Sequence, residues 1–194
     1  LEYFSPEEGV WKPIGTELPY VPGQTDYVFK QINVIPNQAY TFRVAAITKD
    51  NEEVWSSAFI LYTFPVVETR SASSVTGTSA VLNGLFPSSN GTLELKRLGF
   101  MYSLDPNMAA SPTPISLDPA IDRAENQDYA FAANVEALSP NVPYYFQVFA
   151  ENTKGTVFGD ILSFTTPIIT PKVYTKDPSG IDITSAKLNG TLEA

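Results

Sequence analysis

Apolar and polar side chains alternate along several short segments of the chain, which is the pattern of a β-strand that buries one of its two faces. In residues 144–150 the expected inward-facing side chains are Tyr144, Phe146, Val148 and Ala150. No stretch longer than ten residues has the apolar spacing of a helix without an intervening Pro or Gly, and 16 Pro and 11 Gly punctuate the chain at strand-length intervals. The pattern predicts an all-β protein with few and short helices.

The chain also repeats itself. Residues 36–46 (PNQAYTFRVAA) return 104 positions later as residues 140–150 (PNVPYYFQVFA), with six of the eleven positions identical. Residues 78–84 (TSAVLNG) return 106 positions later as residues 184–190 (TSAKLNG). The two blocks lie at different phases of a period that is about one small sandwich long, so the chain holds parts of three units. We predict a unit without its first two strands over residues 1–65, a complete unit over residues 66–167, and the first two strands of a further unit over residues 168–194.

Turn and linker residues agree with this division. Lys154-Gly155 and Asp50-Asn51 take equivalent places in the two longer units, and both pairs are typical of hairpin turns. Pro167 and Pro171 flank the second junction, where each ring fixes φ and favours an extended residue before it. We therefore expect a short, stiff linker and an elongated row of units.

The segment LSPNVPYYFQVFAENTKGTVFGDILSFTT, residues 138–166, resembles the end of a fibronectin type III domain, in particular the variety common in bacterial secreted and surface proteins. Leu138 precedes Tyr144 by six residues, which is the spacing of a tyrosine corner, and Val34 and Tyr40 repeat it. The resemblance implies tandem immunoglobulin-like β-sandwiches and an extracellular or cell-surface setting. It implies no particular chemistry, because this architecture serves many functions.

Composition narrows the function further. The net charge is −9, with 12 Lys and Arg scattered among 21 acidic residues, so there is no basic stripe for nucleic acid. No apolar run approaches the roughly 20 residues of a membrane-spanning helix, and we expect no membrane insertion. The chain has no His and no Cys, which removes the commonest general base, metal ligands and thiol nucleophile. We expect no enzymatic activity and no cofactor.

Two aromatic residues are the best candidates for a binding surface. Tyr145 and Phe149 fall on the strand face opposite the inward row, where an aromatic pair can stack on sugar rings or anchor a protein partner. The alternative is that the long segment 105–127 or a neighbouring unit covers them. Trp11, Tyr20 and Trp55 are expected in the core or at the sheet edge, because aromatic residues dominate sandwich cores.

Four acidic residues in or beside the long segment, Asp105, Asp118, Asp122 and Asp128, raise the question of a calcium site. Their spacing matches no calcium-loop pattern. We expect solvated acids that stabilise turns, and no bound metal.

Three functions remain open. The first is a non-catalytic structural spacer within a secreted or cell-surface protein, and the second is a carbohydrate- or protein-binding unit that uses Tyr145 and Phe149. The third is self-association, in which residues 168–194 of one molecule add strands to residues 1–65 of the next. Its alternative is a fragment that begins and ends inside repeat units.

Overall fold

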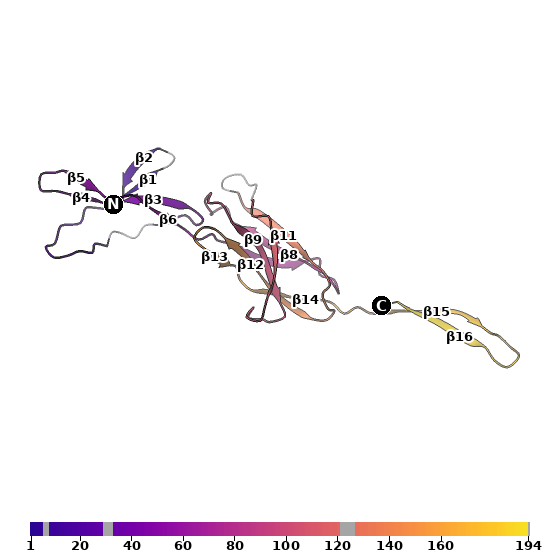
Figure 1. The fold of residues 1–194 in the computed structure, drawn as a ribbon. Helices are drawn as coiled ribbons and strands as arrows, with labels where there is room; N and C mark the ends of the chain where they lie inside the picture. The colour runs from indigo at the N-terminus through magenta and orange to yellow at the C-terminus, as the bar shows by residue number, and fades with distance from the viewer. Residues whose placement is uncertain (6–7, 29–32, 121–126, 194) are drawn as a thin grey trace.

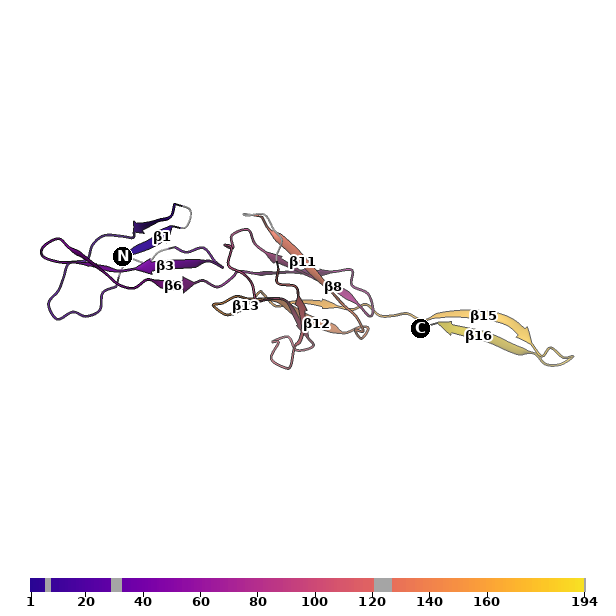
Figure 2. The same ribbon diagram turned by 45° about the horizontal axis from the view of Figure 1, so that its top comes forward.

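The structure is a computed structural model that describes residues 1–5, 8–28, 33–120 and 127–193. Every paired strand is antiparallel, and the described residues form no helix, so none that is long and apolar enough to cross a membrane is found among them. The prediction of an all-β fold is confirmed. We call residues 1–65 the N-terminal unit, residues 66–167 the central unit and residues 168–193 the C-terminal hairpin, and these three parts lie end to end in both views (Figure 1, Figure 2).

The central unit is an immunoglobulin-like sandwich of two sheets. One sheet has the order β11-β8-β7, and the other has the order β10-β9-β12-β13, with β14 also paired to β12. The strands are β7 (Glu68–Ser73), β8 (Ala80–Phe86), β9 (Arg97–Ser103), β10 (Thr113–Leu117), β11 (Tyr129–Val135), β12 (Pro143–Glu151), β13 (Thr156–Phe158) and β14 (Leu162–Thr165).

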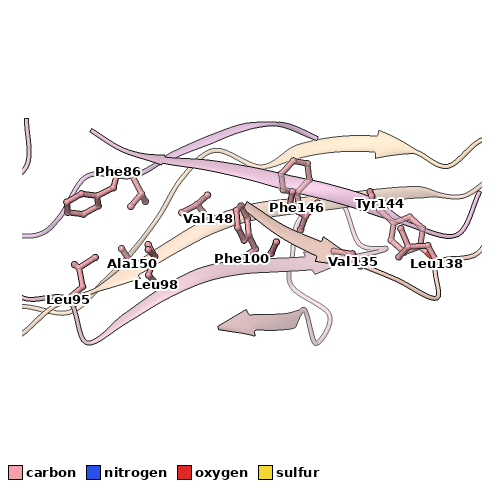
Figure 3. Close-up of a cluster of buried hydrophobic side chains, with 14 residues drawn as sticks. Phe86, Leu95, Leu98, Phe100, Val135, Leu138, Tyr144, Phe146, Val148 and Ala150 are labelled. Atoms are coloured by element: carbon pink, nitrogen blue, oxygen red, sulfur yellow. The ribbon is translucent and has the colours of Figure 1, made fainter. Parts of the chain in front are cut away.

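The core of this sandwich lies between the two sheets. Strand β8 alternates between buried and half-buried residues along its whole length, as expected for a strand with one face inward. Strand β12 contributes the predicted row, and Phe146, Val148 and Ala150 are fully buried. Figure 3 shows this row packing against side chains from β8, β9 and β11, such as Phe100 and Val135. The predicted inward row of Tyr144, Phe146, Val148 and Ala150 is therefore confirmed, although Phe149 between the last two is buried as well.

The tyrosine corner predicted from sequence spacing occurs in both units. The phenol oxygen of Tyr144 accepts a hydrogen bond from the backbone N–H of Ser139 at 2.9 Å. In the N-terminal unit, Tyr40 accepts the equivalent bond from the N–H of Ile35 at 2.7 Å. This repeated contact supports the view that the two segments are equivalent strands in two separate units.

The N-terminal unit contains a four-stranded sheet of order β2-β1-β3-β6 and a separate β4-β5 hairpin. These pairings match those of β10, β9, β12, β14 and β13 in the central unit, and counterparts of β7, β8 and β11, the strands of the second sheet, are not found in its described residues. The strands are β1 (Glu2–Ser5), β2 (Val10–Pro13), β3 (Ala39–Arg43), β4 (Ala45–Ile47), β5 (Glu53–Trp55) and β6 (Phe59–Tyr62).

The C-terminal hairpin consists of β15 (Lys172–Ser179) and β16 (Lys187–Glu193), which pair only with each other. Every residue of β15 is exposed. Residues 172–193 make no hydrogen bond to the described part of the central unit, so the hairpin extends beyond the sandwich (Figure 1).

Candidate functional site

The two aromatic residues predicted to form a binding surface lie in different environments on β12. Tyr145 is half-buried and pairs in register with Ser103 of β9. Phe149 is only 1% exposed. The predicted exposure of Phe149 is therefore wrong, and the two rings do not form an exposed pair. Tyr145 remains a predicted contact residue on its own.

Phe149 is buried because of its neighbours on β9. Gly99 lies opposite Phe149 in the register, and a Cβ atom there would be 3.1 Å from Phe149 Cε1 and 2.0 Å from the carbonyl oxygen of Ile115 on β10. The absent side chain thus leaves room for the ring. The guanidinium of Arg97 covers the ring at 5.1 Å from its centroid, which is a cation–π contact.

A second aromatic group, in the N-terminal unit, surrounds an arginine. The guanidinium of Arg43 lies 4.3 Å from the Trp11 ring centroid and 3.8 Å from that of Trp55, and it donates to Glu2 Oε2 at 2.7 and 3.0 Å. Both Trp side chains are half-buried at sheet edges, as predicted. Tyr20 is 78% exposed, so its predicted place in the core or sheet edge is wrong.

A cleft of about 820 Å³ opens beside these aromatic rings and is lined by residues that include Glu2, Tyr20, Tyr27, Ile47 and Trp55. None of its lining residues is buried. Small-molecule sites usually enclose most of their ligand, so this open depression does not have the geometry of one. No group of three or more His, Cys, Asp or Glu side chains that could hold a metal occurs in the described part of the chain.

The acidic residue at the start of the long segment organises its own loop. The two carboxylate oxygens of Asp105 accept backbone hydrogen bonds from Asn107 at 3.0 Å, Ala109 at 3.0 Å and Ala110 at 2.9 Å. These bonds favour the charged form, and the bond from Asn107 contributes most to lowering the pKa of Asp105.

The other acidic residues serve different turns. Asp118 accepts the backbone N–H of Ala120 at 2.9 Å, and Asp128 accepts that of Ser88 at 2.7 Å. Asp122 lies outside the described residues. The prediction that these acids stabilise turns is confirmed for Asp105, Asp118 and Asp128.

The boundary between the N-terminal and central units brings three buried asparagines together. Asn37 comes from the turn before β3, Asn90 from the loop between β8 and β9, and Asn152 from the turn between β12 and β13. They are 1%, 5% and 1% exposed. Burial of an amide is unfavourable unless its hydrogen bonds are satisfied, so their partners define this joint.

Asn37 connects the two units directly. Its Nδ2 donates to the carbonyl oxygen of Leu93 at 2.6 Å and to that of Gly91 at 3.4 Å, and its Oδ1 accepts from Asn152 Nδ2 at 2.9 Å. Its backbone carbonyl accepts the N–H of Leu93 at 3.0 Å. The side chain and main chain of one residue therefore hold two loops of the central unit.

The other two asparagines hold the linker. Asn152 Nδ2 donates to the carbonyl oxygen of Thr63 at 2.8 Å, while its Oδ1 accepts the N–H of Lys154 at 2.8 Å. Asn90 pairs with the backbone of Val66 through both amide atoms, at 2.8 and 2.9 Å. The linker is thus fixed to the central unit on both sides of Pro65.

The joint also depends on a glycine. The N–H of Gly91 donates to the carbonyl oxygen of Pro36 at 2.7 Å. A Cβ atom on Gly91 would lie 2.1 Å from Gln38 Oε1 and 3.0 Å from the carbonyl oxygen of Asn37. A side chain at this position would displace the Gln38 side chain and crowd the Asn37 carbonyl oxygen. The described residues contain no buried side-chain polar atom that lacks a hydrogen-bond partner.

Sequence reasoning did not identify this joint. The Pro-Asn pair of residues 36–37 is visible in the sequence only as part of the repeat, and its recurrence at 140–141 is the available signal.

Comparison with known proteins gives no family assignment. No protein-family model matches the chain, and no curated protein matches it. The chain is similar in structure to the sensor domain of the anti-sigma factor RsgI4 of Pseudobacteroides cellulosolvens (17% identity, TM-score 0.41, covering 55% of this chain and 93% of that one). It is similar to the sixth fibronectin type III domain of human fibronectin type III domain containing protein 3 (19%, TM-score 0.42, covering 56% and 91%). It is also similar to the FN1–FN3 domains of chicken CNTN1 (19%, TM-score 0.33, covering 73% and 47%). Similarities at these values carry no conclusion about function.

Proposed function

We propose that the chain is a non-catalytic structural spacer within a secreted or cell-surface protein. The observation that carries the proposal is the joint between the first two units, where the buried side chains of Asn37, Asn90 and Asn152 are all hydrogen-bonded. A joint of this kind holds two units at one mutual orientation. A spacer needs this property, because it keeps what it connects at a set distance.

Two further observations fit the proposal. The units lie end to end, so the chain spans more length than a compact protein of its size (Figure 2). The extracellular setting is the one implied by the fibronectin type III resemblance. A non-catalytic role fits a chain that contains neither His nor Cys and has an open cleft without buried lining residues.

Small-angle X-ray scattering tests the spacer function. We expect a pair-distance distribution with the long tail of an elongated particle. A symmetric distribution typical of a compact globule would overturn the proposal.

A second candidate function is self-association through residues 168–194. It is favoured by the apolar side chains of the hairpin, because Val173, Leu188 and Leu192 are 76%, 85% and 67% exposed. Sedimentation of the full chain over a range of concentrations, compared with Leu188→Glu, tests it. Concentration-dependent oligomers that the substitution removes would support this candidate, and an unchanged monomer would refute it.

A further inference from the structure

The Pro-Asn turn before β3 recurs before β12, and the asparagine has the same backbone conformation in both. Asn37 and Asn141 both adopt the left-handed conformation, with φ of 51° and 58°. The N–H of Asn37 donates to the carbonyl oxygen of Phe64 at 2.8 Å, and that of Asn141 donates to the carbonyl oxygen of Thr166 at 3.0 Å. Asparagine is among the few residues that tolerate this conformation.

The hydroxyl that supports the turn is also repeated. Thr63 Oγ1 accepts the N–H of Gln38 at 2.8 Å, and Thr166 Oγ1 accepts the N–H of Val142 at 3.0 Å. The threonine contacts of the two turns are therefore equivalent, whereas the acceptor of the asparagine N–H differs by one residue: it is Phe64, the residue after Thr63, in the first turn and Thr166 itself in the second.

The two turns differ in what lies beyond them. Asn37 is buried against loops of the central unit, which satisfy its amide. Asn141 is exposed, and its side chain makes no hydrogen bond to any described residue. The central unit thus carries the same turn as the N-terminal unit, but without a neighbour bound to it.

We propose that the asparagine of this turn attaches one unit to the next through the hydrogen bonds of its side chain, a contact that we call the grip. We propose that Asn141 offers the same contact to a following sandwich of the same kind. The inference deepens the proposed spacer function and rests on it. Repetition of one joint would give every pair of neighbouring units the same orientation.

The first joint defines what the partner must present. The partner needs a loop with two carbonyl oxygens two residues apart, as in Gly91 and Leu93, to accept from the asparagine Nδ2. A glycine fits best at the first of these positions, because a Cβ atom there would displace the Gln38 side chain and lie 3.0 Å from the Asn37 carbonyl oxygen. It also needs an amide donor equivalent to Asn152.

The polar part of the joint is what the two turns share. In the first joint the Phe64 ring lies near Lys154 Nζ, 5.7 Å from the ring centroid, and a Cβ atom on Gly155 would be 3.1 Å from that ring. Pro167 occupies the equivalent linker position after Thr166. The second grip therefore depends on hydrogen bonds at Asn141 rather than on this ring contact.

Spin-label distance measurements on the full chain test the grip, and the absence of native Cys allows labels at introduced cysteines alone. Exposed sites are Ile60 on β6, Ala132 on β11 and Lys176 on β15. We expect a single narrow distance peak for the Ile60–Ala132 pair, because the first joint is fixed. We expect a broad distribution for the Ala132–Lys176 pair, since the hairpin makes no hydrogen bond to the described central unit.

Two matched variants distinguish the contribution of the asparagine side chain from that of the turn's backbone conformation. Asn37→Gly keeps the left-handed backbone accessible but removes the amide. We expect it to abolish the narrow peak of the first pair. Asn141→Gly makes the same change in the same turn and should leave both distributions unchanged. If the Ile60–Ala132 distance peak stays narrow in Asn37→Gly, the proposed role of the asparagine side chain is wrong.

An extended chain tests the second site. A copy of residues 89–167 placed after Ala194 continues the repeat in register, because Ala194 corresponds to Ser88, and it supplies the partner loop and amide. We expect the Ala132–Lys176 distribution to narrow, and Asn141→Gly to broaden it again. A distribution that stays broad, or that does not respond to this variant, would overturn the second site.

A second version of the extension guards against poor folding of the hybrid unit. Here a full copy of residues 66–167 follows Pro171, the repeat equivalent of Pro65, in place of residues 172–194, since that segment contains a complete core of its own. Its second label is placed at the copied equivalent of Arg70 on β7, and the same outcomes apply. The grip and the spacer function can fail separately, because a compact scattering profile refutes the spacer, whereas an elongated particle with an insensitive first peak refutes only the grip.

Discussion

Substitution of Gly84 on β8 tests whether this strand is packed in a closed core, whereas β16, which carries the same sequence motif, is open to solvent. A Cβ atom at this position would lie 2.7 Å from two atoms of the Phe131 ring and 2.8 Å from Val148 Cγ2. Its repeat equivalent, Gly190 on β16, has a single neighbour within 4 Å, the carbonyl oxygen of Tyr174 at 3.2 Å. Substitution of each glycine by alanine therefore adds the same methyl group to the same sequence motif in two environments.

The expected magnitude follows from packing. An added methyl group in a close-packed core costs about 1–3 kcal/mol of unfolding free energy, and Phe131 cannot move freely because its ring also contacts Phe100 at 5.4 Å. Loss of glycine from the unfolded chain returns about 0.4–1 kcal/mol. We expect Gly84→Ala to destabilise the central unit by about 1–2 kcal/mol and Gly190→Ala to change stability by less than about 0.5 kcal/mol.

Differential scanning calorimetry with hydrogen–deuterium exchange measures these effects. Gly84→Ala should lower the melting temperature of the central unit by roughly 4–16 °C, because 1 kcal/mol corresponds to about 4–8 °C for a domain of this size. Faster exchange should be confined to residues 66–167. Equal effects of the two substitutions, or an unchanged central unit in Gly84→Ala, would refute the assignment of β8 to a closed core and β16 to an open hairpin.

Three further outcomes are expected. Tyr144→Phe removes the acceptor for the Ser139 N–H and should cost about 1 kcal/mol in chemical denaturation, and an unaltered midpoint would count against the tyrosine corner. The pKa of Asp105 is lowered, so its loop hydrogen bonds should be intact above the ordinary pKa of an aspartate and be lost as the pH falls through the lowered value; amide NMR shifts that change already near the ordinary pKa would contradict this. Arg43→Met should destabilise the N-terminal unit by about 1–2 kcal/mol, read from Trp fluorescence because both Trp lie in that unit, whereas an identical unfolding curve would show that the ring contacts contribute nothing.

The parts of the fold that were predictable from sequence depend on local patterns. The period of two in β12 identified the buried row, since alternate side chains of a strand must face opposite sides. The six-residue spacing identified the tyrosine corner, and Lys154-Gly155 identified a turn in which Gly155 has a φ of +146°. These signals need only neighbouring residues.

The features that sequence reasoning missed depend on residues far apart in the chain. Phe149 is covered because Gly99, 50 positions earlier, lies opposite it. Asn37 is buried because the loop around Leu93, 56 positions later, closes over it. The alternation of β12 gives the face of each side chain but not what packs on that face.

The two longer units differ in what contacts two equivalent valines, Val148 of β12 and Val44 after β3. In the central unit the N–H of Val148 donates to Thr69 Oγ1 of β7 at 3.1 Å, and the Val148 carbonyl accepts the N–H of Gly159 at 3.0 Å. In the N-terminal unit the N–H of Val44 donates instead to Ser56 Oγ at 3.0 Å, and its carbonyl accepts the N–H of Ser56 at 2.8 Å. Ser56 therefore takes the place of both Thr69 and Gly159. Thr69 belongs to β7, the first strand of the central unit.

This replacement bears directly on self-association through the C-terminal hairpin. Thr175 of β15 is the repeat equivalent of Thr69, so docking by the geometry of the central unit would bring it to the site that Ser56 fills. In the central unit a Cβ atom on Gly159 would lie 2.6 Å from Thr69 Oγ1 and 3.0 Å from Thr69 N, and Ser56 has such an atom. The hairpin of a second molecule can therefore enter the N-terminal unit only if Ser56 is displaced. Sequence identity between repeats does not by itself make their strands interchangeable, because one side chain at the docking site determines whether the strand fits.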